Sequence, residues 1–148
     1  MTSGNTVRLD FHSSLGMLDF VQMVSDHIAR MAGLDDDSIH WVSVAVRESV
    51  INAIKHGNGN DIRKRVHVEF TSLQDGGSPG IAIVVRDEGC GFDPAILADP
   101  LAPENLLKTH GRGIFLMRSF MDEMTFQRDE QGGMQVRMVK RANHSTLA

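Results

Sequence analysis

The sequence predicts an α+β fold, a two-layer sandwich with helices on one face of a mixed, mostly antiparallel sheet. Two long segments place apolar residues at helical spacing, and five shorter segments alternate or are almost wholly apolar. The predicted order is strand, helix, helix, strand, strand, loop, helix, strand, strand. Consecutive strands joined by short turns imply antiparallel pairing, and the helices then cover one face of the sheet.

Both long helices are predicted in the first half of the chain. Ser13 and Ser14 are candidate caps of a helix that runs to about Met31 and ends at Gly33. Its apolar positions are Leu15, Leu18, Val21, Val24 and Ile28. The second helix begins in the acidic stretch "LDDDS", which suits the positive end of the helix dipole, and Gly57 is its expected C-cap. Its apolar stripe consists of Ile39, Val42, Val46, Val50 and Ala53.

The strands are predicted from alternation and from apolar content. "TVRLDF" and "RVHVEFTS" alternate, whereas "IAIVVRD" is nearly all apolar, which predicts a central strand. "QDGGSPG" is a predicted turn and "GIFLMRSFM" a predicted helix. "MTFQRDEQGGMQVRMVK" predicts two strands joined by a Gly-Gly turn, and residues 141–148 are expected to form a frayed tail.

Composition indicates a globular protein with a single domain over residues 1–148. The content of 41% hydrophobic and 23% charged residues is ordinary for such a domain. The net charge of −4, without basic blocks, argues against direct nucleic-acid binding. Cys90 is the only cysteine, so an internal disulfide is excluded. With no apolar run near the roughly 20 residues that span a bilayer and no signal region, we expect a cytoplasmic protein without membrane attachment.

The stretch "ESVINAIKHG" carries polar side chains at steps of four. Such steps place Glu48, Asn52 and His56 on one strip of the second helix, beside its apolar stripe. A carboxylate can take a proton, and an Asn carbonyl is a hard-oxygen metal ligand, so the strip can hold Mg²⁺ and activate an attacking hydroxyl. The same pattern is also typical of a polar helix edge whose side chains are satisfied locally.

The stretch "RDEGCGF" follows the predicted central strand. It presents Asp87 where the strand ends, and Gly89 and Gly91 leave backbone without Cβ atoms, so that a flat ligand can approach closely. An aspartate at such a point can accept a hydrogen bond from an exocyclic amine, such as that of adenine. The alternative is a simple turn after a strand.

The stretch "THGRGIFLM" places Gly111 and Gly113 directly before a predicted helix. The first amide groups of a helix lack intrahelical partners and bind anions, above all phosphate. No Walker A motif occurs in the chain, and a glycine pair at a helix start is by itself a weak signal. Lys108, His110 and Arg112 either neutralise phosphate or form a solvated face.

These three stretches are complementary. The first can supply a metal ligand and a base, the second can hold an adenine, and the third can bind phosphates. The proline-broken segment 94–110 lies between the second and the third, where a lid would be placed. Together they predict a nucleotide site.

In this order and spacing, "ESVINAIKHG", "RDEGCGF" and "GRGIFLM" resemble the N, G1 and G2 boxes of the GHKL ATP-binding superfamily. The form E-x-x-x-N-A-x-x-H-G and the stretch "MRSFMDEM" most resemble the bacterial anti-sigma-factor serine/threonine kinases. The resemblance extends from Val7 to Lys140. It implies a histidine-kinase-like, Bergerat-type ATP-binding fold.

The resemblance also implies roles for single residues. Glu48 corresponds to the base that activates the acceptor hydroxyl, and Asn52 to the Mg²⁺ ligand. Asp87 corresponds to the adenine-binding carboxylate, with Gly89 and Gly91 giving the base room.

The remaining implied roles concern the phosphates. Gly111 and Gly113 correspond to the phosphate turn, and residues 94–110 to the ATP lid, which includes the nucleotide-contacting candidate Lys108; Arg112 is a further candidate. His56 is either structural or adjacent to the phosphates.

The implied activity is ATP- and Mg²⁺-dependent serine phosphorylation. Such kinases bind a sigma factor and phosphorylate a STAS-domain anti-sigma antagonist, and they commonly form homodimers. Members often have Gly-Thr after the final turn, where this chain has Met134. The alternative is therefore a non-catalytic ATP-binding module that sequesters its partner. The catalytic half of a histidine kinase is disfavoured, because the first strand begins almost at Met1.

Overall fold

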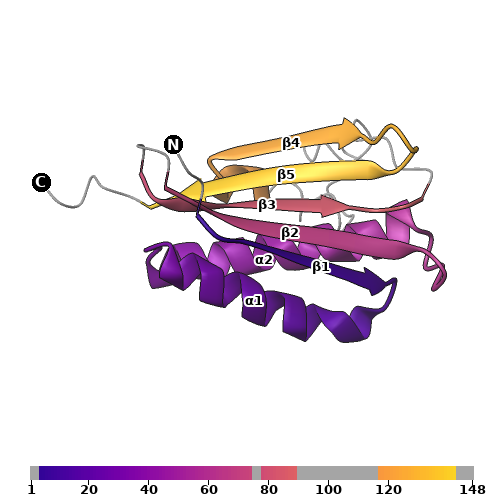
Figure 1. Ribbon diagram of the computed structural model, residues 1–148, viewed down its shortest axis with the longest axis horizontal. Coiled ribbons are helices and arrows are strands. Elements are labelled where there is room, and N and C mark those ends of the chain that lie inside the picture. The colour runs from indigo at the N-terminus through magenta and orange to yellow at the C-terminus, as the bar shows by residue number, and fades with distance from the viewer. Residues whose placement is uncertain (1–3, 75–77, 90–116, 143–148) are drawn as a thin grey trace, which may run out of the picture.

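The computed structural model describes residues 4–74, 78–89 and 117–142. The strands are β1 (Thr6–His12), β2 (Arg65–Leu73), β3 (Gly80–Arg86), β4 (Glu123–Arg128) and β5 (Met134–Arg141). The helices are α1 (Leu18–Met31) and α2 (Asp36–Asn52) (Figure 1). A 3₁₀ turn, η1 (Leu15–Met17), precedes α1, and a π-helical turn, η2 (Ala53–Gly57), continues α2.

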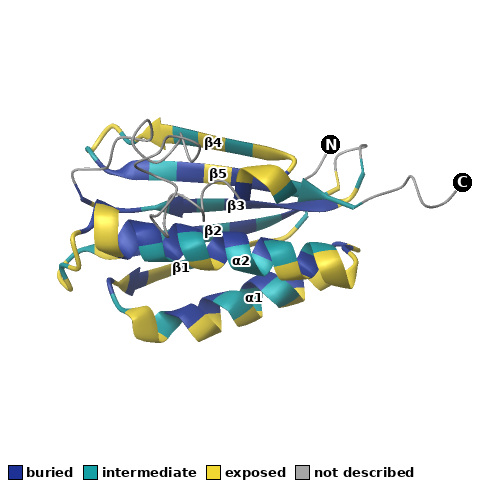
Figure 2. Ribbon diagram, turned by 180° about the vertical axis from the view of Figure 1, so that it is seen from behind, coloured by how far each residue is buried: buried dark blue, intermediate teal, exposed yellow. Residues whose placement is uncertain are grey.

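The strands form one sheet in the order β1-β2-β3-β5-β4, and every described pair is antiparallel. Strand β3 is central, as its apolar sequence predicts. Helices α1 and α2 lie together on one face of this sheet (Figures 1 and 2). The predicted two-layer α+β sandwich is therefore confirmed, as are the predicted strands and their order in the chain. The described sheet is wholly antiparallel, whereas the sequence predicts a mixed sheet.

The core lies between the helices and the sheet. In the register, Val85 of β3 pairs with Val68 on one side and Val136 on the other, and all three are buried. The predicted apolar stripe of α2 faces them: Ile39, Val42, Val46, Val50 and Ala53 are all buried. Because alternate strand residues point to opposite faces, this packing fixes which strand residues reach α2.

The start of α2 follows the prediction. Asp35 is the N-cap, and its carboxylate accepts a hydrogen bond from the Ser38 amide at 2.8 Å. Asp36 and Asp37 lie in the first turn, where the helix dipole favours negative charge. The helix therefore begins at a side-chain N-cap, and its apolar stripe packs against the sheet.

The end of α2 differs from the prediction. Gly57 is not a C-cap; it is the last residue of the π-helical turn, and Asn58 is the C-cap. The left-handed residues that end the helix are Gly59, with φ of 61°, and Asn60, with φ of 61°. The turn begins directly after Asn52, and because a π-turn bonds i to i+5, steps of four no longer align His56 with Asn52.

The α1 prediction is mostly correct. Ser14 caps the 3₁₀ turn by accepting from the Gly16 amide at 3.3 Å, and Gly33 ends α1 with φ of 92°. Leu18, Val21 and Ile28 are buried as predicted. Leu15 is an exception at 47% exposed, because it precedes α1 in the 3₁₀ turn and does not face the sheet.

Three predicted segments fall wholly or partly outside the described residues. These are the "QDGGSPG" turn, the tail after 140, and the helix "GIFLMRSFM", of which residues 117–120 are described and helical. Within the described ranges, no helix is long and apolar enough to cross a membrane.

Candidate functional site

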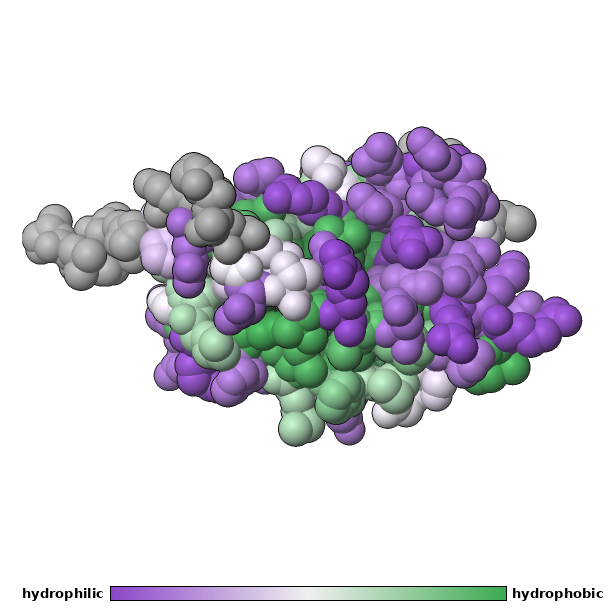
Figure 3. Space-filling model, in the orientation of Figure 1, coloured by the Kyte–Doolittle hydropathy of each residue, from purple (hydrophilic) through white to green (hydrophobic). Residues whose placement is uncertain are grey.

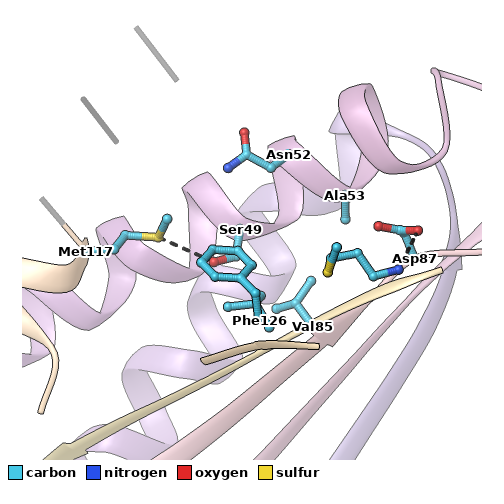
Figure 4. A pocket seen from close by; sticks show the side chains of 9 residues that line it. Ser49, Asn52, Ala53, Val85, Asp87, Met117 and Phe126 are labelled. Carbon is cyan, nitrogen blue, oxygen red and sulfur yellow. Dashed lines mark hydrogen bonds between the residues drawn. The ribbon is translucent and has the colours of Figure 1, made fainter. Parts of the chain in front are cut away.

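A small pocket lies between the second half of α2 and the sheet (Figure 4). Ser49 and Asn52 of α2 and Ala53 of η2 line one side. Asp87, the residue after β3, closes one end. The opposite wall consists of apolar side chains: Val85, Met117, Phe126, Met134 and Val136. The cavity is therefore an apolar slot with a few polar groups at its rim, the usual character of a small-molecule site.

Asp87 is held rigidly at the end of the cavity. It is 1% exposed, and its Oδ1 accepts hydrogen bonds from the backbone amides of Gly89, at 3.0 Å, and Met134, at 3.2 Å. The Asp87 amide donates to the Met134 carbonyl at 3.1 Å. Burial raises the pKa of this carboxyl above its ordinary value, while the two amide bonds oppose the shift. Oδ1 is thus occupied by backbone, which leaves Oδ2 to accept from a ligand.

Three glycines from separate segments pack around Asp87. A Cβ on Gly57 would overlap Asp87 Oδ2, and a Cβ on Gly133 would overlap the Asp87 carbonyl oxygen. A Cβ on Gly89 would overlap the Gly57 carbonyl oxygen. Glycine is needed at each position for close approach rather than for an unusual φ. The end of α2, the residues after β3 and the β4–β5 turn are therefore in direct contact here.

Asn52 is the second polar group of the cavity wall. It is 3% exposed, and its Oδ1 is buried without a hydrogen-bond partner. An unsatisfied buried carbonyl costs free energy, and such sites in native proteins often await a ligand or an ion. Among the described residues no three His, Cys, Asp or Glu side chains gather to hold a metal. A hard cation bound at Asn52 would take its other ligands from phosphate and water, which suits Mg²⁺.

The comparisons with known proteins agree with this geometry. Residues 13–140 match the family model described as the histidine kinase-like ATPase domain. The chain belongs to the histidine kinase-like ATPase family. It is similar to the serine-protein kinase RsbW of Staphylococcus aureus strains JH9 and Newman, with 30% identity over 135 residues, covering 86% of this chain and 81% of each relative.

A solved structure shows the same fold. The crystal structure of the RsbU and RsbW domains of Rv1364c from Mycobacterium tuberculosis matches with a TM-score of 0.65 and 17% identity. The match covers 93% of this chain and 32% of that longer one. The GHKL resemblance drawn from the sequence motifs is thus confirmed at the level of family and fold.

The structure brings two of the predicted site residues into one cavity and places three others outside its lining. Asn52 and Asp87, which are 35 positions apart, line the same cavity. Glu48 is half-buried one turn before Asn52 on α2, and His56 is exposed in the π-helical turn. Gly89 lies against the end of α2. The predicted residues Gly91, Lys108, Gly111, Arg112 and Gly113 lie outside the described residues.

Asn58 is a site residue that the sequence motifs do not reveal. Its side-chain amide donates to Ser13 Oγ at 2.9 Å and to the Arg65 carbonyl at 3.0 Å, and its Oδ1 accepts from the Glu88 amide at 2.8 Å. It therefore ties the end of α2 to the segment that carries Asp87. The sequence around it, "HGNGN", predicts a turn and gives no indication of these contacts.

Proposed function

We propose that this ATPase-family protein is an ATP-dependent protein serine kinase. The observation that carries the proposal is that Asn52, with a buried and unpartnered oxygen, and Asp87, with a backbone-locked carboxylate, line one apolar cavity. A slot of this kind suits a planar base at the Asp87 end and a cation-bound phosphate chain at the Asn52 end. The similarity to a serine-protein kinase directs the proposal to serine.

Each polar group has one role in the proposed reaction. Asp87 Oδ2 accepts a hydrogen bond from the adenine amine, and the apolar wall contacts the ring faces. Glu48, four residues before Asn52, takes the proton of the acceptor serine hydroxyl as its oxygen attacks the γ-phosphorus and ADP leaves. Asn52 would hold Mg²⁺, which would neutralise phosphate charge when bound.

The proposed partners follow from the resemblance. We assign a sigma factor and a STAS-domain anti-sigma antagonist, the antagonist being the serine substrate. The similarity to RsbW over 86% of the chain supports this assignment. Which sigma factor and which antagonist bind depends on the outer surface of the protein and not on the residues that line the cavity.

A homodimer is proposed through the face formed by β1 and α1. In the described part of the chain β1 is an edge strand, so its outer backbone groups have no strand partner. Val7, Phe20 and Met23 line an open apolar groove beside it, and Figure 3 shows apolar side chains gathered over β1 and α1. Edge strands that pair antiparallel across a two-fold axis bury such a surface in both copies at once.

The second candidate function is partner sequestration without phosphate transfer. It is favoured by the exposed side chains of α1, where Met23 is 67% and Met31 63% exposed. Methionine-rich surfaces adapt to partner proteins. In this candidate ATP is a structural ligand, and Glu48 has no chemical task.

Transfer of labelled phosphate separates the two candidates. The protein is incubated with γ-labelled ATP, Mg²⁺ and candidate STAS proteins, and label on the acceptor serine is followed. The kinase proposal expects transfer by the wild type and by the control Glu123→Ala, an exposed acid on β4. It expects Glu48→Ala to bind ATP normally and to lose transfer by about 100-fold or more. Transfer at the wild-type rate by Glu48→Ala would remove Glu48 as the base, and binding without transfer to any STAS protein would favour sequestration.

A further inference from the structure

Ser49 contributes the single hydroxyl among the described residues that line the nucleotide cavity. It is 3% exposed. Within the described residues, its single O–H has only thioether sulfurs as acceptors, that of Met117 at 3.4 Å and that of Met138 at 3.5 Å. Sulfur is a weak acceptor, so this hydroxyl gives up its water partners on folding and gains little in return. A stronger acceptor brought into the cavity would therefore be bound preferentially.

The proposed ligand needs a donor that Asp87 cannot supply. Adenine presents its amine as a donor and its ring nitrogens as acceptors. An ionised carboxylate only accepts, so Asp87 complements the amine and leaves the ring nitrogens without a partner. Met134 holds Asp87 through its backbone amide, and its side chain has no hydroxyl to offer.

Ser49 is placed to supply that donor from the opposite wall. Figure 4 shows it pointing from α2 towards the sheet, with Met117 on one side and Asp87 on the other. Asn52 also has an N–H donor, but its side chain lies at the outer rim of the cavity, farther from the sheet than Ser49. Within the described wall, Ser49 is thus the side-chain donor on the sheet-facing side of α2, in the same cavity as Asp87.

We propose that Ser49 is a specificity-determining residue of the nucleotide site, whose hydroxyl donates a hydrogen bond to a ring nitrogen of the adenine that Asp87 holds. The proposal rests on the proposed ATP-dependent function. In this proposal the hydroxyl comes from Ser49 on α2, because Met134 on β5 has none. Exchange of a sulfur acceptor for a nitrogen acceptor on ligand binding makes the cavity selective for a base with a nitrogen at that position.

The test measures binding by calorimetry, with Mg²⁺ present, of ATP and of its 1-deaza, 3-deaza and 7-deaza analogues. Each analogue replaces one ring nitrogen by C–H. Ser49→Ala is expected to bind ATP about three- to tenfold more weakly than the wild type, the usual effect of one neutral hydrogen bond. One deaza analogue should bind the wild type more weakly than ATP does, by the same factor of about three to ten. The same analogue and ATP should bind Ser49→Ala with equal affinity. Ser49→Cys, which keeps the volume but donates weakly, should behave like Ser49→Ala.

Ser25→Ala is the matched control, because Ser25 has a buried helical hydroxyl without a partner and lies on α1 outside the cavity. It should bind ATP like the wild type. The Ser49 proposal is overturned if Ser49→Ala binds ATP with wild-type affinity, or if it weakens ATP and all three analogues by equal factors, which marks a packing defect. Failure of the wild type to bind any adenine nucleotide would instead contradict the proposed function, and the Ser49 proposal with it.

Discussion

Asp87 and Met134 are joined by two hydrogen bonds: the Met134 amide donates to Asp87 Oδ1 at 3.2 Å, and the Asp87 amide donates to the Met134 carbonyl at 3.1 Å. Both bonds use the Met134 backbone. The strand after the last turn therefore orients the carboxylate whatever side chain stands at 134. Methionine at 134 therefore leaves the backbone support of Asp87 in place.

Asp87→Asn should separate binding from stability. The amide keeps an oxygen that can accept from Gly89 and Met134, but it loses the charge-assisted acceptor that faces the ligand. We expect ATP affinity to fall by about 10- to 100-fold. The variant should remain folded in urea denaturation. Wild-type ATP affinity in calorimetry would contradict the assignment of the base to Asp87.

The pH dependence of stability should change in Asp87→Asn. Burial raises the pKa of Asp87 above its ordinary value of 3.8, so ionised Asp87 destabilises the folded state above its folded pKa. That cost disappears as the pH falls through the folded pKa. We expect the variant to be more stable than the wild type at neutral pH and to lose this advantage as the pH approaches 3.8.

Glu88→Gln is the matched control for this titration, because the pKa of Glu88 is lowered in the folded protein whereas that of Asp87 is raised. The Arg65 amide bond, and then the contact with His67, lower the pKa of Glu88. Its stabilisation is present above the ordinary pKa of 4.5 and is lost as the pH falls through the lower folded value. The control should therefore be less stable than the wild type at neutral pH and approach it in acid. Parallel curves for both variants would show that burial of the Asp87 charge is not the cause.

Gly57→Ala should damage the site through the Asp87 carboxylate. The new Cβ would overlap Asp87 Oδ2, the oxygen assigned to adenine. We expect a loss of about 1–3 kcal/mol in the free energy of unfolding, the usual cost of overpacking, and at least about tenfold weaker ATP binding. Gly16→Ala is the control, because its Cβ would make only an ordinary contact with Ser14. Equal effects of the two variants would contradict the close contact.

Asn58→Ala should loosen the link between α2 and the Asp87 segment. It removes three hydrogen bonds and leaves the Glu88 amide and the Arg65 carbonyl without that partner. We expect a loss of about 2–4 kcal/mol on urea denaturation. The exposed Asn5→Ala should be nearly neutral. If Asn58→Ala is also neutral, the three bonds do not hold the site together.

The dimer proposal predicts that negative charges introduced on the β1–α1 face separate the two copies. Phe20→Glu combined with Met23→Glu should convert a dimer into a monomer in light scattering after gel filtration, because both side chains line the apolar groove and are exposed. ATP affinity should persist if each copy has its own cavity. Ile62→Glu, exposed but outside the groove, should stay dimeric. A monomeric wild type at tens of micromolar would contradict the proposal.

The sequence predicted the fold and the main polar groups of the cavity because both depend on local patterns. The apolar stripe of α2 and the apolar β3 fix the two walls, and Asn52 and Asp87 stand at fixed offsets from them. Their meeting in one cavity follows from packing α2 on β3.

Other features depend on contacts between distant segments, which a linear pattern does not contain. Gly57 resembles a helix cap in sequence, but its neighbour is Asp87, 30 positions away. Asn58 resembles a turn residue and instead bonds to three segments. Ser49 is inconspicuous beside Glu48, and only its burial among sulfur atoms marks it.

The most direct test of the central claim is calorimetric titration of ATP into the wild type and Asn52→Ala, each with and without millimolar Mg²⁺. The account predicts that the wild type binds ATP and that Mg²⁺ strengthens this binding. The strengthening should be largely lost in Asn52→Ala, because the cation loses its protein ligand. No uptake of adenine nucleotide by the wild type in Mg²⁺, or an equal Mg²⁺ effect on both proteins, would contradict it.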